Sequence, residues 1–121
     1  MADPVFDTSI LIDWLRDRPE AVAELERYRR HRISRVSWME ILACEPLETR
    51  DHVQALIAPF EIIELDGRIA AAAADIRHRS RMKLLDATIL ATAQVNGAIL
   101  VTRNIADFPA NMPGIRIPYT L

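Results

Sequence analysis

The feature that most constrains the fold of this chain is the alternation of short apolar segments with longer segments of helical spacing. Strands that alternate with helices favour a parallel sheet covered by helices on both faces. In such sheets, ligands bind outside the carboxyl ends of the strands. We therefore predict a three-layer α/β/α domain with a central parallel sheet of four to five strands. The expected strands cover residues 5–6, 32–36, 60–65 and 98–102, with an edge strand at 115–119.

The segments between these strands contain helix signals. Thr8 or Ser9 can cap the first helix, and Asp66 can cap the helix that runs through residues 70–74. Asn96 and Gly97 end the last helix. The expected helices cover residues 8–16, 20–30, 37–45, 47–58, 67–74 and 86–95.

Length and composition favour one domain over residues 1–121, because 121 residues can bury a single sizeable core. The N-terminus lacks a basic segment followed by an apolar one. The longest uncharged run, 87–102, is shorter than the roughly 20 apolar residues of a membrane helix. Cys44 is the only cysteine, which excludes an internal disulfide and fits a reducing compartment. We expect a cytoplasmic protein without a membrane segment, with Cys44 packed in the interior.

Two basic runs interrupt a chain whose net charge is −2. Residues 27–35 include five arginines and no acid, and residues 77–83 include four cationic side chains and no acid. The rest of the chain has 6 basic residues against 17 acidic ones. This distribution suits a protein that binds a polyanion and also holds a cation, although two solvated helix faces would give the same pattern. The candidate RNA-binding residues are Arg29, Arg30, Arg32, Arg77, Arg79, Arg81 and Lys83.

An aspartate lies inside the first apolar segment, "VFDTSILIDWL". An ionised carboxylate out of water costs several kcal/mol unless another group compensates it. Asp7 follows the first expected strand, Glu40 lies just past the second, and Asn104 and Asp107 follow the fourth. The carboxyl ends of parallel strands share one edge, so these side chains should meet there.

The combination resembles the PIN-domain ribonucleases, and among them the VapC-type toxins of bacterial type II toxin–antitoxin systems. The matching segments, in family order, are "FDTSILIDWL", "SWMEIL", "LLDATILATA" and "LVTRNIADFP", which together span nearly the whole chain. The resemblance implies a Mg²⁺-dependent endoribonuclease, with Mn²⁺ as a substitute, that cuts single-stranded or structured RNA. It also implies a homodimer inhibited by a small DNA-binding antitoxin of the VapB type.

By position, Asp7, Glu40 and Asp86 correspond to the three central acids of that family. The fourth acid corresponds to Asn104 or to Asp107, and we favour Asp107 as the acid and Asn104 as a positioning group. We therefore predict Asp7, Glu40, Asp86 and Asp107 as catalytic and metal-binding residues, supported by Thr8, Ser9, Thr102 and Asn104. The stretch before Asp86 is shorter than usual and lacks a common glycine, so the resemblance does not define the entrance of the site.

Clustered carboxylates suit magnesium, which prefers oxygen ligands and keeps several waters. One or two such ions can activate water, orient the scissile phosphate and stabilise the charge on the leaving oxygen. Without an ion the acids would repel one another, and at least one pKa would rise.

Each acid also has a structural interpretation. Asp7 can cap the first helix, and Asp86 can complement a helix dipole. Glu40 completes the capping-box pattern Ser37-x-x-Glu40. Asp107 can be an ordinary loop acid, and Asp13 is expected on the polar face of its helix.

Two further functions remain open. The first is a catalytically silent PIN-like module that binds RNA or a partner. The second is a phosphohydrolase with Asp7 as nucleophile, which Ser9 disfavours because such enzymes commonly need an aspartate two residues along. Apolar residues including Trp14, Trp38 and Met39 suggest an interface for a second copy or a partner, or else simply a core.

Overall fold

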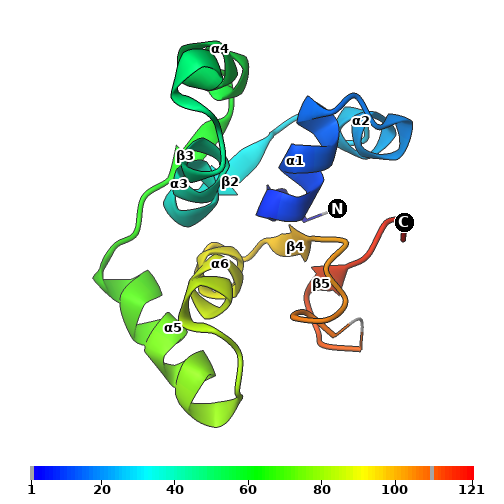
Figure 1. Ribbon diagram of the computed structural model, residues 1–121. Coiled ribbons are helices and arrows are strands. Elements are labelled where there is room, and N and C mark those ends of the chain that lie inside the picture. The colour runs from blue at the N-terminus through cyan, green and yellow to red at the C-terminus, as the bar shows by residue number, and fades with distance from the viewer. Residues whose placement is uncertain (1, 110) are drawn as a thin grey trace.

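The centre of the molecule is a five-stranded parallel sheet with strand order β3-β2-β1-β4-β5 (Figure 1). The computed structural model describes residues 2–109 and 111–121. All four strand pairs are parallel, and Val5 of β1 is paired with Arg32 on one side and Leu100 on the other. The predicted parallel sheet is therefore confirmed. The strands are β1 (Pro4–Phe6), β2 (Arg32–Ser34), β3 (Glu61–Ile63), β4 (Ile99–Val101) and β5 (Ile115–Arg116).

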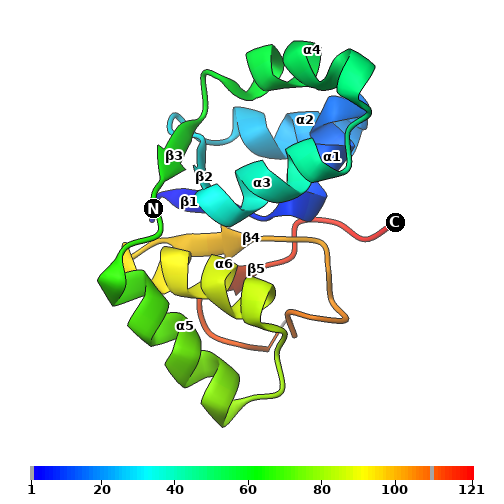
Figure 2. The same ribbon diagram turned by 60° about the vertical axis from the view of Figure 1, so that its left-hand side comes forward.

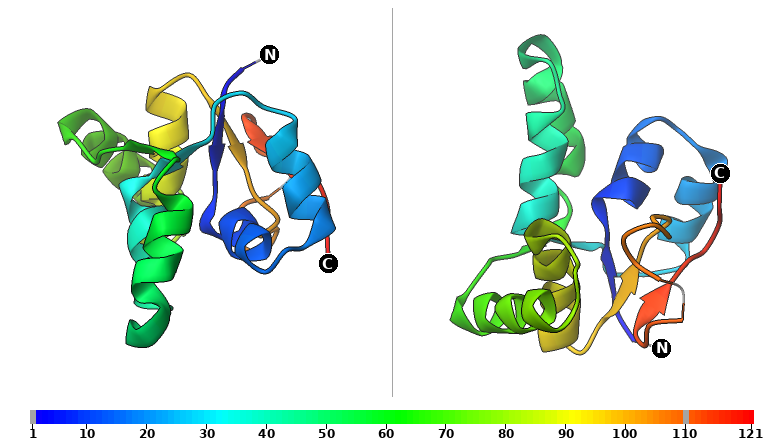
Figure 3. Two further views of the ribbon diagram at one scale, coloured as in Figure 1. Left: turned by 90° about the horizontal axis from the view of Figure 1, so that it is seen from above. Right: turned by 60° about the horizontal axis from the view of Figure 1, so that its bottom comes forward.

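Helices cover the sheet and connect its parallel strands, two helices per crossover for the first three connections. Figures 2 and 3 show α1 and α2 on one side of β1, and α5 and α6 on the other. The three-layer α/β/α architecture is thus confirmed. The helices are α1 (Thr8–Leu15), α2 (Pro19–Glu26), α3 (Arg35–Ala43), α4 (Leu47–Ile57), α5 (Gly67–Arg79) and α6 (Leu84–Val95).

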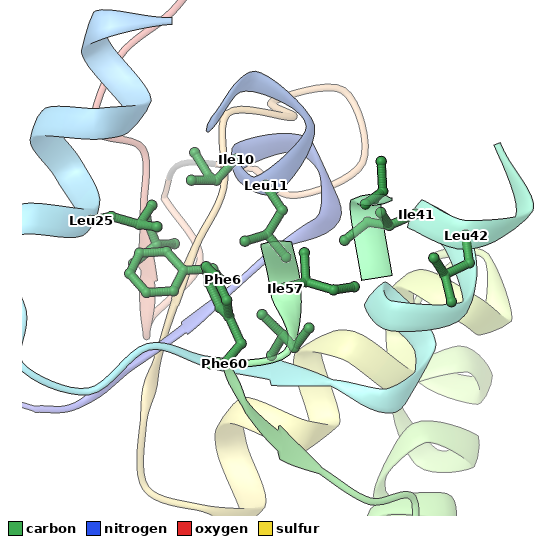
Figure 4. Packing of buried hydrophobic residues seen from close by; sticks show 11 residues of the cluster. Phe6, Ile10, Leu11, Leu25, Ile41, Leu42, Ile57 and Phe60 are labelled. Carbon is green, nitrogen blue, oxygen red and sulfur yellow. The ribbon is translucent and has the colours of Figure 1, made fainter. Parts of the chain in front are cut away.

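The core has one large cluster on each face of the sheet, as the side-chain alternation of a strand requires. Phe6 of β1 packs with residues of α1, α2, α3 and α4 (Figure 4). Val5, its neighbour, packs with Ile89 and Leu90 of α6. Both faces of β1 are fully buried, so β1 holds the residue that follows it in a fixed position.

Several boundaries differ from the predicted ones for local reasons. Asp7, not Thr8 or Ser9, is the N-cap of α1. The third helix begins at Arg35, because the Ser34 hydroxyl accepts a hydrogen bond from the Ser37 N–H and caps it. The predicted cap Asp66 is confirmed, since its side chain accepts from Ile69 N at 2.9 Å, but α5 continues to Arg79.

The structure also shows the environments of four residues whose burial was predicted or left open from the sequence. Cys44 is exposed at the end of α3, so the predicted burial was wrong. Trp14 contacts the Phe60 ring edge to face at 5.2 Å, and the Arg35 guanidinium lies 4.7 Å from the Trp38 ring. Both tryptophans therefore pack against the core, whereas Met39 is 53% exposed.

No helix within residues 2–109 and 111–121 combines the length and the apolar character needed to cross a bilayer.

Candidate active site

A cavity of about 540 Å³ opens at the carboxyl edge of the sheet, where β1 and β4 end. The cavity receives side chains from α1, α3, α6 and the segment after β4, four elements distant in the sequence. All four predicted acids and three of the four predicted supporting residues line it. The lining residues are Asp7, Thr8, Ser9, Ile12, Glu40, Cys44, Lys83, Leu84, Leu85, Asp86, Arg103, Asn104 and Asp107.

Asp7 lies at the point where β1 ends and α1 begins. Its backbone N–H extends the sheet by donating to Val101 O at 2.8 Å, and its side chain is 4% exposed. One carboxylate oxygen, Oδ2, accepts from the hydroxyls of Ser9 at 2.7 Å and Thr102 at 2.8 Å, and from Ser9 N at 3.4 Å. These bonds compensate part of the cost of burial, and Asp7 both caps α1 and lines the cavity.

Glu40 lies in the middle of α3, three residues beyond the position a capping box requires. Its carboxylate accepts a hydrogen bond of 2.6 Å from the Thr8 hydroxyl. Ser34 caps the helix, so the capping interpretation of Glu40 is wrong. The Thr8 bond instead fixes the Glu40 carboxylate beside the start of α1.

Asp86 lies in the first turn of α6 and shows the strongest electrostatic effect in the cavity. Burial, and after it the charges of Asp107, Asp7 and Glu40, raise the pKa of Asp86 to about 6, against the opposing effect of Lys83. The four acids therefore act on one another electrostatically, although their residue numbers span a hundred positions.

Asn104 and Asp107 form a reciprocal pair after β4. The Asn104 amide donates to the Asp107 carboxylate at 2.8 Å, and its carbonyl oxygen accepts from Asp107 N at 3.3 Å. Asn104 N in turn donates to the Thr102 hydroxyl at 3.0 Å. Asn104 therefore holds Asp107 in place, which agrees with the predicted division between an acid and a positioning group.

The donor chemistry of the cavity fits a divalent cation. Four carboxylates and two cationic side chains, Lys83 and Arg103, give the lining a formal charge of −2 when all are ionised. Within the described ranges, no three His, Cys, Asp or Glu side chains already lie close enough together to hold a metal ion. The acids face a common space without contacting one another, and a hard cation of charge +2 would neutralise the net charge of the lining.

Comparisons with known proteins identify the family of the chain. The family model for the PIN domain matches residues 5–109. The chain belongs to the PIN-domain family. A chain of a toxin–antitoxin complex from Klebsiella pneumoniae is 36% identical to it with a TM-score of 0.90, and the match covers 98% of this chain and 100% of that one.

Other solved structures share the PIN fold at lower identity. A DNA-bound VapBC from Salmonella typhimurium is 24% identical with a TM-score of 0.78, covering 97% of each chain. FitAcB from Neisseria gonorrhoeae is 22% identical with a TM-score of 0.77, covering 98% of this chain and 99% of that one. No curated protein sequence matched the chain. The predicted resemblance to PIN domains of the VapC type is confirmed.

The two basic runs lie at different edges of this PIN domain. Arg30 forms ion pairs with Asp3 and Glu61 at the amino ends of β1 and β3, and Arg32 is 6% exposed. Arg29 is exposed but belongs to the same edge, away from the cavity. The structure does not bring these three predicted RNA-binding residues to the acids.

The second run adjoins the acids. Lys83 lines the cavity directly, and a smaller hollow of about 280 Å³ beside it is lined by Arg81, Lys83 and Asp107. Arg77 and Arg79 are exposed in the last turn of α5, where they also complement the helix dipole. Exposed cationic side chains thus follow the chain from the end of α5 to Lys83 at the acidic cavity.

The sequence interpretation missed three residues of the PIN domain's site region. Asp13 was expected on a polar helix face, but its side chain is fully buried, so that expectation was wrong. It binds Arg103, which lines the cavity, and Tyr119 near the C-terminus. The available signal was Arg103 itself, a charged residue two positions after the strand "ILV".

We expect Glu40→Gln to abolish most activity while leaving stability nearly unchanged. The substitution removes a negative charge that would help to hold a cation in the cavity, and weakening the stabilisation of transition-state charge by one group lowers rates by about 100- to 1000-fold. Glutamine keeps an acceptor for the Thr8 hydroxyl, and α3 keeps its Ser34 cap. RNA cleavage rates and urea unfolding of the same preparation measure the two effects.

The matched comparison is Ser34→Ala, which removes the actual cap of α3. It should lower the free energy of unfolding by about 0.5–2 kcal/mol. A Glu40→Gln protein with this loss of stability and a wild-type rate would restore the capping interpretation.

Proposed function

We propose that this chain is the toxin of a toxin–antitoxin pair and that it acts in the cytoplasm as a Mg²⁺-dependent endoribonuclease. The observation that supports this most directly is the convergence of four acids on one cavity, with the pKa of Asp86 raised to about 6. Perturbed carboxylates gathered in a cleft are typical of catalytic sites.

Each acid has its own part in the proposed site. Asp7, Glu40, Asp86 and Asp107 would hold the ion, with Mn²⁺ as a substitute for Mg²⁺. When bound, the ion supplies activation of a water molecule and neutralises charge at the scissile phosphate. Ser9 and Thr102 fix the Asp7 carboxylate, Thr8 fixes Glu40 and Asn104 fixes Asp107. These bonds hold the acids in place before substrate binds, which reduces the reorganisation that catalysis requires.

The partners are proposed from the comparisons and from one groove. The similar Klebsiella pneumoniae chain comes from a toxin–antitoxin complex, so we propose a small DNA-binding antitoxin of the VapB type as inhibitor. A groove of about 490 Å³ between α1, α3 and α4 shares Ile12 and Cys44 with the acidic cavity. An antitoxin segment in this groove would end beside the acids.

We also propose that the chain forms a homodimer, since the apolar side chains of Met39, Leu84 and Leu85 are more than half exposed. Light scattering at micromolar concentration tests the oligomeric state.

The direct test is RNA cleavage by the chain purified free of antitoxin. We expect cutting with Mg²⁺ or Mn²⁺, none with EDTA, and recovery when excess metal is returned. The alternative, a catalytically silent module that binds RNA or a partner, predicts binding without cutting under every condition. Intact acids and their hydrogen bonds favour the nuclease.

We expect Arg79→Ala combined with Arg81→Ala to weaken RNA binding in a salt-dependent way. Both residues are exposed in the second basic run, and Arg81 lines the hollow beside the cavity. Each phosphate neutralised on a single strand contributes about −0.7 to the slope of log K against log salt, so two lost contacts should flatten the slope by roughly one to one and a half units. The measurement is an RNA titration at several salt concentrations, with Ca²⁺ replacing Mg²⁺ to suppress cutting.

The matched control is Arg29→Ala combined with Arg30→Ala at the opposite edge of the sheet, where no change of slope is expected. A flattened slope in this control alone would move the RNA path to the first basic run.

A further inference from the structure

A buried charge network connects the C-terminal segment to the acidic cavity. The Asp13 side chain on α1 is fully buried. Its Oδ1 accepts from Arg103 Nη2 at 3.0 Å, and its Oδ2 accepts from Arg103 Nε and, at 2.7 Å, from the Tyr119 hydroxyl. Figure 3 shows the C-terminal segment running beside α2, and the bond from the Tyr119 hydroxyl joins this segment to Asp13 of α1. Asp13 is therefore satisfied as an ionised group.

The pKa values support a fixed ion pair. Burial raises the pKa of Asp13, but the bonds from Arg103 and Tyr119 lower it below its usual range overall. The bond to Asp13 raises the pKa of Arg103, against the effect of partial burial. Arg18 adds a longer contact of 3.5 Å to the same carboxylate. Two arginines on one acid leave a net positive charge beside the site.

Arg103 keeps binding capacity toward the cavity. Asp13 occupies the edge of the guanidinium formed by Nε and Nη2. Among residues 2–109 and 111–121, no acceptor takes a hydrogen bond from Nη1, and the side chain is 31% exposed and lines the cavity. A guanidinium has five N–H donors in a rigid fork, and its second edge matches two oxygens of a phosphate.

The backbone of Arg103 is also fixed relative to the acids. Its N–H donates to the Ser9 hydroxyl at 3.3 Å, and this same hydroxyl donates to Asp7. The flanking residues, Thr102 and Asn104, bond to Asp7 and Asp107 respectively. Arg103 is thus held at both its main chain and its side chain, next to two of the acids.

We propose that Arg103 binds a phosphate of the RNA at the acidic cavity, and that Asp13 and Tyr119 position its guanidinium for this contact. The inference rests on the proposed nuclease function and adds a phosphate-binding group to it. Four acids repel a polyanion, so a cation fixed among them is needed to bring the RNA backbone close. Tyr119 makes the C-terminal segment part of this arrangement.

The test compares Arg103→Ala and Arg103→Lys with Arg18→Ala, which removes the other arginine on Asp13 without changing the cavity lining. Binding of fluorescent single-stranded RNA is titrated at several salt concentrations in Ca²⁺. The slope of log K against log salt should flatten by about 0.7 in Arg103→Ala and stay unchanged in Arg18→Ala. Mn²⁺ affinity of Arg103→Ala should not fall, because a cation is removed from the site.

Cleavage kinetics separate phosphate binding from a structural role. Arg103→Ala should lower kcat/KM by up to about 100-fold, the size expected when a reacting group is misplaced by about 1 Å. Arg103→Lys keeps the charge and should restore the salt slope, but its rate should stay low because an ammonium lacks the second edge. Tyr119→Phe should lower kcat with little change in KM, since the phosphate contact remains but is less well oriented.

The outcomes distinguish this inference from the proposed function. A wild-type protein that cuts RNA, together with an Arg103→Ala protein of unchanged slope and rate, overturns the inference alone. A wild-type protein that binds RNA without cutting, with the slope change still present, overturns the nuclease function and supports the phosphate contact. A wild-type protein that binds no RNA overturns both. If Arg103→Ala does not fold, the cleavage rates of Arg103→Lys and Tyr119→Phe test the inference instead, and wild-type rates in both variants would overturn it.

Discussion

Asp7→Asn protein is expected to fold like the wild type and to lose RNA cleavage by about 100- to 1000-fold. The substitution removes one charge from the four acids that would hold the cation. Asparagine is as good an N-cap as aspartate, so α1 keeps its start. The side chain also keeps an oxygen for the Ser9 and Thr102 hydroxyls. Single-turnover cleavage with Mg²⁺, together with a thermal unfolding curve, measures activity and fold in one preparation.

The control for this variant is Asp51→Asn, the same chemical change on the exposed surface of α4. Its rate should equal that of the wild type. Mn²⁺ binding by calorimetry adds a readout that does not depend on RNA, and Asp7→Asn should bind the ion more weakly. Folded Asp7→Asn protein that cuts at the wild-type rate would contradict the proposed site.

The layered fold could be predicted because its signals are local and repeat along the chain. Strands β1 and β2 are buried on both faces, which favours short apolar segments, and each is followed by a helix with its own side-chain cap. The first residues of the helices were harder to predict, because several residues that can act as N-caps follow one another in the sequence. Asp7, Thr8 and Ser9 can all cap a helix, and only the pairing of Asp7 N with Val101 O decides among them.

The acids of the site could be predicted from topology and from resemblance. Parallel strands end at one edge, so Asp7, Glu40 and Asp107 were expected together, while Asp86 needed the family pattern. The supporting bonds were only partly predictable. That the Thr8 hydroxyl donates to Glu40 depends on how α1 packs against α3, whereas the bond between Asn104 and Asp107 is local and matches the positioning role expected of Asn104.

The buried Asp13 shows why other parts could not be predicted. Its position on α1 suits a polar face by spacing alone, and its partners come from residues 90 and 106 positions later. The prediction that the first basic run lies on the surface was incomplete for the same reason, because burial depends on contacts between distant residues. Arg32 reads as one of several surface arginines, but it lies on a strand and its side chain is buried against Pro4 O.

We expect Asp86→Asn to stabilise the metal-free protein at neutral pH and to weaken Mn²⁺ binding. In the folded protein, burial and the neighbouring acids raise the pKa of Asp86 from 3.8 to about 6. The folded state therefore holds this proton more tightly than the unfolded state, so the carboxyl lowers stability as pH rises from about 4 to 6 and keeps it lowered above that range. Asparagine removes this effect. Thermal unfolding in EDTA at pH 5 and pH 7 should show a larger gain at pH 7.

Metal binding in the wild type should have the opposite dependence on pH. A carboxylate must lose its proton to bind an ion, so Mn²⁺ affinity should fall by about tenfold per pH unit below 6 and level off above it. Calorimetric titrations between pH 5 and pH 8 measure this directly, and Asp75→Asn on the exposed face of α5 serves as the matched control. In Asp86→Asn protein the remaining dependence should move to lower pH, because the group with the raised pKa is gone. Wild-type affinity that stays constant from pH 5 to pH 8 would show that Asp86 is not among the ligands, and the cation would then be held by Asp7, Glu40 and Asp107 without it.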